Sequence, residues 1–130
     1  ESPICNSKLN TDKNFNSGLD FVFNNLKRIS FVCASHNEDS ILKVIEMMKL
    51  NGLSNNDNKI WFGQLYGMSD NISFNLASKS YNTFKILPFG SVKNLMPYLI
   101  RRAEENTSVQ GQTGRELQLI LKEKQRRSLL

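Results

Sequence analysis

Two arginines stand side by side in the segment YLIRRAEEN, residues 98–106. Neighbouring residues on a helix are about 100° apart, so Arg101 and Arg102 point in different directions. Arg102 lies at helical spacing from Leu95 and Leu99, on an apolar stripe where a buried charge needs a partner. Because a guanidinium fork matches two carboxylate oxygens, the pair could bind the carboxylate of a small ligand.

The neighbouring glutamates offer a simpler interpretation of the arginine pair. Glu104 and Glu105 could neutralise both arginines at the helix surface, and Glu105 lies three residues after Arg102, within reach on the same helix. The helix alone does not decide between these interpretations.

His36 is the only histidine, and it follows the apolar run ISFVCA, residues 29–34. Ser35 and Asn37 flank it with hydroxyl and amide groups, and both are candidate N-caps for the next helix. Such groups at a helix N-terminus suit a phosphate or a ribose. The structural alternative is a histidine that is hydrogen-bonded to a nearby backbone group.

Other chemistries lack the residues that they need. The sequence has no G-x-S-x-G segment, no G-x-G-x-x-G segment and no P-loop, so a serine hydrolase, an ordinary dinucleotide domain and an NTPase are not expected. One histidine without a nearby cysteine pair has no metal-ligand spacing, so no metal site is expected.

Three short apolar runs predict strands at residues 29–34, 59–65 and 83–87. The first run does not alternate, which is typical of a parallel strand covered on both faces. Apolar residues at helical spacing predict helices between and around the strands. These helices are expected around residues 15–26, 41–48, 70–76, 91–102 and 113–121, capped by Ser35 with Glu38, by Asp70, and by Thr113 with Glu116, while residues 1–13 are expected to be irregular.

Alternation of helices and strands predicts an α/β fold with parallel strands. Two architectures are open: a doubly wound sheet, or the C-terminal part of a (β/α)₈ barrel, since a complete barrel needs about 250 residues. In both, the ligand site lies at the carboxyl ends of the strands. Those ends read ASHN, QLYGM and LPFGS.

The composition is that of a folded domain with a basic end. The chain has 130 residues, 39% of them hydrophobic, and a formal net charge of +5. Cys5 and Cys33 differ in context, so a buried Cys33 and a reducing compartment are expected. No transmembrane run or targeting signal is recognised. The chain begins with Glu1, so we expect a piece of a longer protein.

The segments ASHNED, FGQLYGMSDNISF and PFGSVKNLMPYLIRRAEENTSV resemble the C-terminal half of the proline dehydrogenase family. The resemblance covers nearly the whole chain. It implies a distorted (β/α)₈ barrel, with residues 1–130 as its last three strands and closing helices. It also implies FAD at the strand ends, hydride transfer from C5 of proline to the flavin, formation of 1-pyrroline-5-carboxylate, and a membrane quinone as electron acceptor.

Carried over position by position, the resemblance implies a set of cofactor contacts. Ser35, His36 and Asn37 would contact the adenosine part of FAD. Leu65 would lie against the flavin. Glu105 is also among the implied cofactor contacts, and it would help to fix the pairing of the arginines with the substrate carboxylate. The family's catalytic Lys and Asp lie upstream of this chain, so we expect no catalytic residue in it and little activity from it alone.

The resemblance also implies the substrate contacts. Arg101 and Arg102 would bind the carboxylate of proline, and Leu65 would lie against its ring. Family members that prefer proline usually carry Tyr two residues before the Pro of P-x-G, where this chain has Ile86. Oxidation of hydroxyproline by a relative of the same family is therefore the alternative. The family also implies a mitochondrial location, at the matrix side of the inner membrane.

Two other hypotheses come from different classes of protein. The basic end could bind a membrane surface or a nucleic acid, but it lacks interleaved aromatic residues, so no nucleic-acid partner is expected. A peripheral membrane contact agrees with a quinone acceptor. The basic residues are Lys122, Lys124, Arg126 and Arg127. A non-catalytic α/β domain that buries its strands by dimerising is the remaining hypothesis.

Overall fold

The computed structural model describes the backbone of residues 4–108 and 112–128, and the side chains of residues 4–104 and 117–128. Two compact units, Glu1–Leu87 and Pro88–Leu130, make up the chain. The first unit holds every strand of the described residues, and the second holds two helices.

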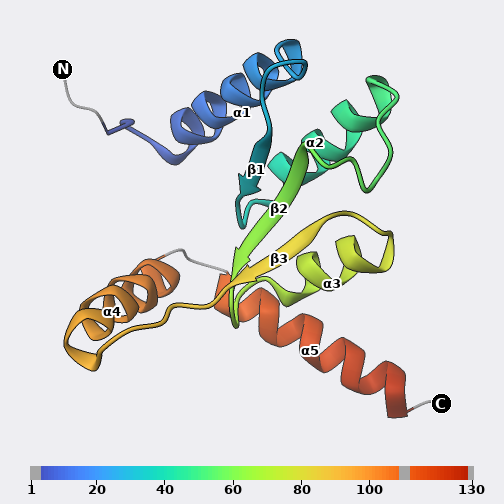
Figure 1. Cartoon of the computed structure of the whole chain (residues 1–130). Helices are drawn as coiled ribbons and strands as arrows, with labels where there is room; N and C mark the ends of the chain where they lie inside the picture. The colour runs from blue at the N-terminus through green and yellow to red at the C-terminus, as the bar shows by residue number, and fades with distance from the viewer. Residues whose placement is uncertain (1–3, 109–111, 129–130) are drawn as a thin grey trace. The chain divides into compact units, whose positions relative to one another are not determined.

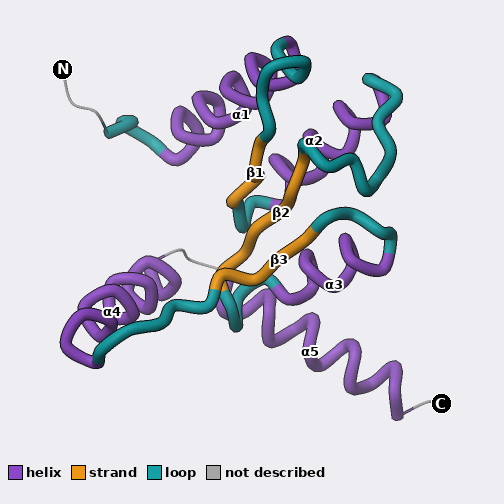
Figure 2. Tube along the Cα trace, in the orientation of Figure 1, coloured by secondary structure: helices purple, strands orange, loops and turns teal. Residues whose placement is uncertain are grey.

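The sheet of the first unit has three parallel strands, β1 (Phe31–Ala34), β2 (Ile60–Leu65) and β3 (Thr83–Ile86), in the order β1-β2-β3 (Figure 1). Since the strands are parallel, the loops that follow them leave the same edge of the sheet (Figure 2). The predicted strands are confirmed. Strands that neighbour one another in chain order are also what a (β/α)₈ barrel has.

Helices α1 (Lys8–Asn24), α2 (Glu38–Leu50) and α3 (Asp70–Ser78) form one apolar core with one face of this sheet. Apolar side chains of these helices and of the strands meet there because each helix has an apolar stripe and each strand contributes alternate residues. The buried members are Leu19, Phe23, Cys33, Ile41, Val44, Met48, Ile60, Phe62, Ile72, Leu76 and Tyr81.

The other face of the sheet stays exposed, which corrects the expectation that the strands are covered on both faces. Val32, Trp61 and Phe84 are 47%, 40% and 37% exposed. Cys33 and Phe62, whose side chains point to the opposite face, are fully buried. We call this the open face, and it comprises Val32, Ala34, Trp61, Gly63, Leu65, Phe84 and Ile86. A doubly wound sheet has helices on both faces, so the open face favours the barrel alternative.

The first helix begins earlier than the sequence predicts. Residues 1–13 were expected to be irregular, but α1 begins at Lys8. Its N-cap, Ser7, accepts a hydrogen bond from the backbone N–H of Asn10 at 3.2 Å. The first turns of α1 are polar and carry no apolar periodicity, so the cap was the signal that located this end.

Of the two candidate N-caps before α2, Asn37 is confirmed, whereas the predicted capping box and the predicted cap of α3 are wrong. Asn37 is the N-cap of α2, and Ser35 Oγ accepts from the N–H of Asn37 at 3.1 Å, so the predicted capping box of Ser35 with Glu38 is wrong. Ser69 rather than Asp70 is the N-cap of α3. In both helices the N-cap is the non-helical residue directly before the first helical residue.

The second unit contains α4 (Val92–Ser108) and α5 (Gln112–Ser128), which confirms both predicted helices. The predicted capping box of Thr113 with Glu116 lies outside the described side chains. Of the helices in the described part of the chain, none has the length and apolar character needed to cross a membrane.

Candidate functional site

The carboxyl ends of β2 and β3 bring two predicted site residues together on the open face. Leu65 and Ile86 are direct partners in the sheet register, so their side chains lie on the same face. The N–H of Tyr66 donates to the carbonyl of Ile86 at 2.9 Å and extends this pairing past the strand ends. Both residues that were expected to line the substrate therefore lie side by side.

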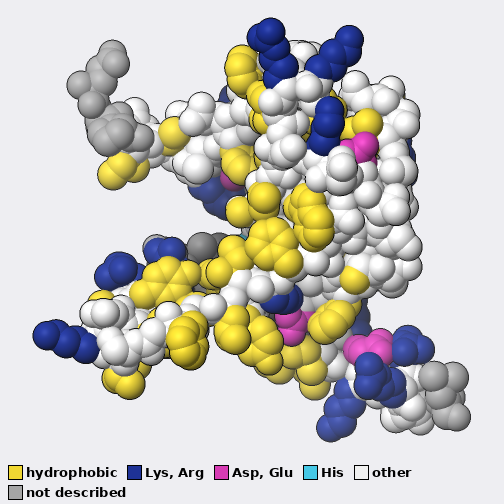
Figure 3. Space-filling model, in the orientation of Figure 1, with side chains coloured by type: hydrophobic (Ala, Val, Ile, Leu, Met, Phe, Trp, Pro, Cys, Tyr) yellow, Lys and Arg dark blue, Asp and Glu magenta, His cyan; other side chains and the backbone are white. Residues whose placement is uncertain are grey.

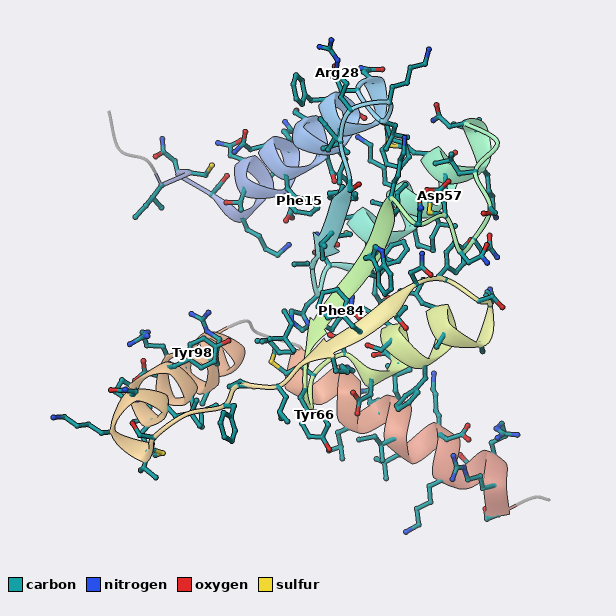
Figure 4. All side chains as sticks on the ribbon, viewed as in Figure 1. Phe15, Arg28, Asp57, Tyr66, Phe84 and Tyr98 are labelled. Atoms are coloured by element: carbon teal, nitrogen blue, oxygen red, sulfur yellow. The ribbon has the colours of Figure 1, made fainter. Side chains whose placement is uncertain are left out.

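An aromatic pair continues this surface toward the middle of the sheet. The ring centroids of Trp61 and Phe84 are 6.4 Å apart, with an angle of 57° between the ring planes. Apolar side chains gather over the strands on the face seen in Figure 3, and Figure 4 labels Phe84 among them. Such a surface can pack against a flat ring or against the apolar part of a small ligand and exclude water from it.

The polar segment after β1 is held by the protein itself. His36 Nδ1 lies 2.7 Å from Ser69 Oγ, in the loop after β2. The structural alternative for the histidine thus holds in a modified form, with a side-chain hydroxyl in place of a backbone group.

Asn37 has a structural role at the same place. Its Oδ1 accepts from the N–H of Asp39 at 3.0 Å, and its Nδ2 donates to Asp12 at 3.2 Å. A hydrogen bond from Lys8, with a smaller contribution from Asn37, keeps the pKa of Asp12 below its usual value. Asp12 is therefore ionised at neutral pH, and the amide of Asn37 is committed at both ends.

A buried polar chain links the ends of β1 and β2. Gln64 is 1% exposed, accepts from Ser73 Oγ at 2.9 Å and donates to the carbonyl of Ser35 at 3.4 Å. Ser73 Oγ also donates to the carbonyl of Ser69 at 3.3 Å. Sequence reasoning missed Gln64, Ser69 and Ser73. The available signal was a polar residue in the apolar run KIWFGQL, because a buried amide must find partners.

The charge around the N-terminus of α2 limits which part of a cofactor could lie there. Glu38 and Asp39 occupy its first turn. Their negative charges interact favourably with the helix dipole and so stabilise the helix, but they repel a bound anion. A pyrophosphate is thus disfavoured at this end, whereas an uncharged ribose or adenine meets no such repulsion. Ser35, His36 and Asn37 are partly buried, and their contact with the adenosine part of FAD stays a prediction.

The two arginines of α4 differ in environment. Arg101 is exposed, whereas Arg102 is partly buried, as are Leu95 and Tyr98. Leu99, which was expected on the same stripe, is 40% exposed. The Arg102 guanidinium carbon lies 5.3 Å from the centre of the Tyr98 ring, labelled in Figure 4. Sequence reasoning missed Tyr98, although a spacing of four residues on a helix predicts such a contact.

Whether these arginines meet a ligand at the strand ends stays a prediction, since they belong to the second unit. The side chain of Glu105 lies outside the described residues, so its role also stays a prediction. In the described part of the chain, no group of three or more His, Cys, Asp or Glu side chains could hold a metal ion.

Parallel strands in sequential order, helices on one face and polar loops at the carboxyl ends define a segment of the (β/α)₈ class. The sequence profile described as Proline dehydrogenase matches residues 1–115, and the chain belongs to this family.

Relatives with established names agree with this assignment. Proline dehydrogenase 1, mitochondrial, of Dictyostelium discoideum is 40% identical over 98% of this chain and 23% of that protein. The human protein of the same name is also 40% identical, over 98% of this chain and 22% of that protein. Hydroxyproline dehydrogenase of Xenopus laevis is 41% identical over 84% of this chain and 23% of that protein. The chain thus spans less than a quarter of the length of these relatives.

A solved structure has the same fold. The crystal structure of proline utilization A (PutA) from Bdellovibrio bacteriovorus, inactivated by N-propargylglycine, superposes with a TM-score of 0.76 and 27% sequence identity. The match covers 83% of this chain and 11% of that one. The predicted family and the predicted part of a (β/α)₈ barrel are both confirmed, and the doubly wound alternative is excluded.

Proposed function

We propose that residues 1–130 form the C-terminal part of an FAD-dependent proline dehydrogenase barrel, which oxidises L-proline to 1-pyrroline-5-carboxylate and passes the electrons to a quinone. One observation supports this most strongly. Leu65 and Ile86, which the family resemblance assigns to the substrate, are register partners at the carboxyl end of the sheet. His36 lies in the loop after the neighbouring strand β1, at the same edge. Catalytic Lys and Asp residues would come from chain upstream of Glu1.

In this proposal the segment after β1 holds the adenosine part of FAD. Ser35 and His36 offer a hydroxyl and an imidazole, and Asn37 keeps the turn in place through its bonds to Asp39 and Asp12. When bound, the flavin supplies the acceptor for a hydride. The acidic first turn of α2 supports an uncharged group at this position.

The open face would hold the ring of the substrate, and the arginines its carboxylate. Leu65 and Ile86 exclude water beside the ring, while Arg101 and Arg102 bind the two carboxylate oxygens and Glu105 fixes that pairing. Held at both ends, the substrate has little freedom left, and this chain's contribution to catalysis is mainly orientation and desolvation.

Hydroxyproline is the second candidate substrate. Ile86 is 41% exposed on the open face, where proline-preferring family members usually carry Tyr. An isoleucine offers no hydroxyl and less bulk, so it leaves room for a substituted ring. The similarity to Xenopus laevis hydroxyproline dehydrogenase supports this candidate as well as the first.

A mitochondrial location and a peripheral membrane contact complete the proposal. Relatives named as mitochondrial support the location, at the matrix side of the inner membrane. Leu117, Ile120 and Leu121 of α5 are exposed on a helix that also carries Arg126 and Arg127. An apolar stripe beside basic residues is typical of a helix that lies on a bilayer surface, where a quinone would be reduced.

A graft tests the proposal. Residues 1–130 would replace the matching segment of Dictyostelium discoideum proline dehydrogenase 1, and the purified chimera would be assayed for flavin content and for proline and hydroxyproline oxidation with a soluble quinone. We expect bound flavin and oxidation of at least one substrate. A folded chimera that binds flavin but oxidises neither would refute the proposal. The 130-residue chain alone is expected to retain little or no FAD, because it spans less than a quarter of its relatives.

A further inference from the structure

We propose that Ser69 is a positioning residue that fixes the orientation of the His36 ring. Ser69 Oγ and His36 Nδ1 are 2.7 Å apart although the residues are 33 positions apart in the sequence. The bond joins the loop after β1 to the loop after β2, across neighbouring strands. The inference deepens the proposed function and rests on it, since that function gives His36 a contact with the adenosine part of the cofactor.

The backbone of Ser69 is fixed on its C-terminal side. Its carbonyl accepts from the N–H groups of Ile72 and Ser73 at 3.1 Å and 3.2 Å, and from Ser73 Oγ at 3.3 Å. The residue is only 6% exposed. A hydroxyl on such an anchored backbone has little freedom to follow a moving ring, so the ring must follow the hydroxyl.

The same network holds the backbone beside His36. Ser73 Oγ donates to Gln64, and Gln64 donates to the carbonyl of Ser35, the residue before the histidine. The N–H of Asn37, the residue after it, donates to Ser35 Oγ at 3.1 Å. The backbone is thus held on both sides of His36, and the bond to Ser69 restricts rotation of its side chain.

The backbone conformation of Ser69 is less favourable for a serine than for a glycine. Ser69 has φ 51° and ψ 43°, the left-handed region in which glycine carries no penalty. At Ser69, the contact of the hydroxyl with His36 Nδ1 offsets part of this cost. Ser80, at the other end of α3, has φ 62° and is exposed, so it carries the same strain without contact with His36.

These two serines provide a matched experiment on the 130-residue chain. Because His36 is the only histidine, a sample labelled with ¹⁵N-histidine gives the signals of one imidazole, and their chemical shifts report the tautomer and its exchange. We expect one dominant tautomer in the parent chain and averaged shifts in Ser69→Gly. Ser80→Gly should match the parent. Glycine suits both backbones, so both variants should stay folded.

A conservative variant tests whether the hydroxyl itself matters. Ser69→Cys keeps the size of the side chain but forms weak hydrogen bonds, so its imidazole shifts should fall between those of the parent and Ser69→Gly. Imidazole signals in Ser69→Gly and Ser69→Cys that match the parent would overturn the positioning role. Averaged shifts in Ser80→Gly would do the same, since they would indicate a general loosening.

Flavin affinity in the chimera described above gives the functional readout. Loss of one neutral hydrogen bond predicts about fivefold weaker FAD binding in Ser69→Gly, with oxidation at saturating FAD little changed. Unchanged FAD affinity together with a freed ring would refute the link between Ser69 and the cofactor. A parent chimera without flavin would refute the proposed function instead, and the imidazole spectra would still decide the role of Ser69.

Discussion

The tip of the Phe84 ring lies against the backbone of Gly63 on the open face, and the two residues are partners in the sheet register. A Cβ atom at Gly63 would come within 2.8 Å of Phe84 Cζ, closer than such atoms approach in folded proteins. The glycine thus makes room for the aromatic ring, which in turn covers the bare backbone of its neighbour. This pair shapes the apolar surface beside Leu65 and Ile86.

Gly63→Ala should displace the Phe84 ring and destabilise the first unit by about 1 kcal/mol, as a mild case of overpacking. Phe84 is partly exposed and its ring tip can move, which keeps the cost small. The free energy of unfolding, measured with urea, gives the value. Gly18→Ala is the control, because a Cβ at this exposed position in α1 meets nothing within 4 Å. It should stabilise by about 0.5–1 kcal/mol.

The double variant isolates the cause of the Gly63 effect. In a Phe84→Ala background the ring is gone, so Gly63→Ala should become neutral or stabilising, as Gly18→Ala is. An equal destabilisation with and without the ring would mean that the Phe84 contact does not require the glycine.

The arginine pair should bind the substrate rather than stabilise the fold. In the chimera, Arg101→Ala and Arg102→Ala are each expected to raise the KM for proline, with a loss of roughly 2–5 kcal/mol in binding. Arg126→Ala is the control, since Arg126 forms an exposed ion pair with Glu123 at 2.8 Å. Steady-state kinetics and thermal unfolding of the same samples separate the two effects. Unchanged kinetics in either Arg101→Ala or Arg102→Ala would remove the carboxylate clamp.

Substitution at Ile86 should change the choice of substrate. Ile86→Tyr adds bulk and a hydroxyl beside Leu65, so the ratio of kcat/KM for proline to that for hydroxyproline should rise, by about 10-fold or more if the rings clash. The comparison needs both substrates in the same chimera. Val32→Ile, on the same face but on β1, controls for added apolar volume. An unaltered ratio in Ile86→Tyr would place residue 86 away from the substrate ring.

The two cysteines should react with thiol reagents at very different rates. Burial raises the pKa of Cys33 to about 12, so its thiolate is scarce at pH 8, and the side chain is also shielded by the core. Cys5 is partly exposed. Native protein should therefore react quickly at one thiol and release the second only on unfolding, and Cys5→Ser should abolish the fast phase. Rapid reaction in Cys5→Ser would contradict the buried environment of Cys33.

Much of the site could be predicted because it depends on local pattern. The three strands and the position of His36 after the first of them follow from short apolar runs with turn residues at their ends, whereas the register that pairs Leu65 with Ile86 does not. The early start of α1 could not be predicted in this way, since its first turns are polar and the helix depends on the Ser7 cap.

The links between distant residues were decided by tertiary structure. No spacing in the sequence connects His36 with Ser69, or Gln64 with Ser73 and Ser35, because these bonds join loops that only the parallel register of β1 and β2 brings together. The open face is the same kind of case. An apolar run such as ISFVCA shows that both faces of the strand are apolar. Which of the two faces the helices cover depends on the direction of the chain crossovers. Periodicity thus determined the class of fold, and the resemblance of whole segments indicated the family. Hydrogen bonds and packing across strands decided how the site is held, since their geometry exists only in three dimensions.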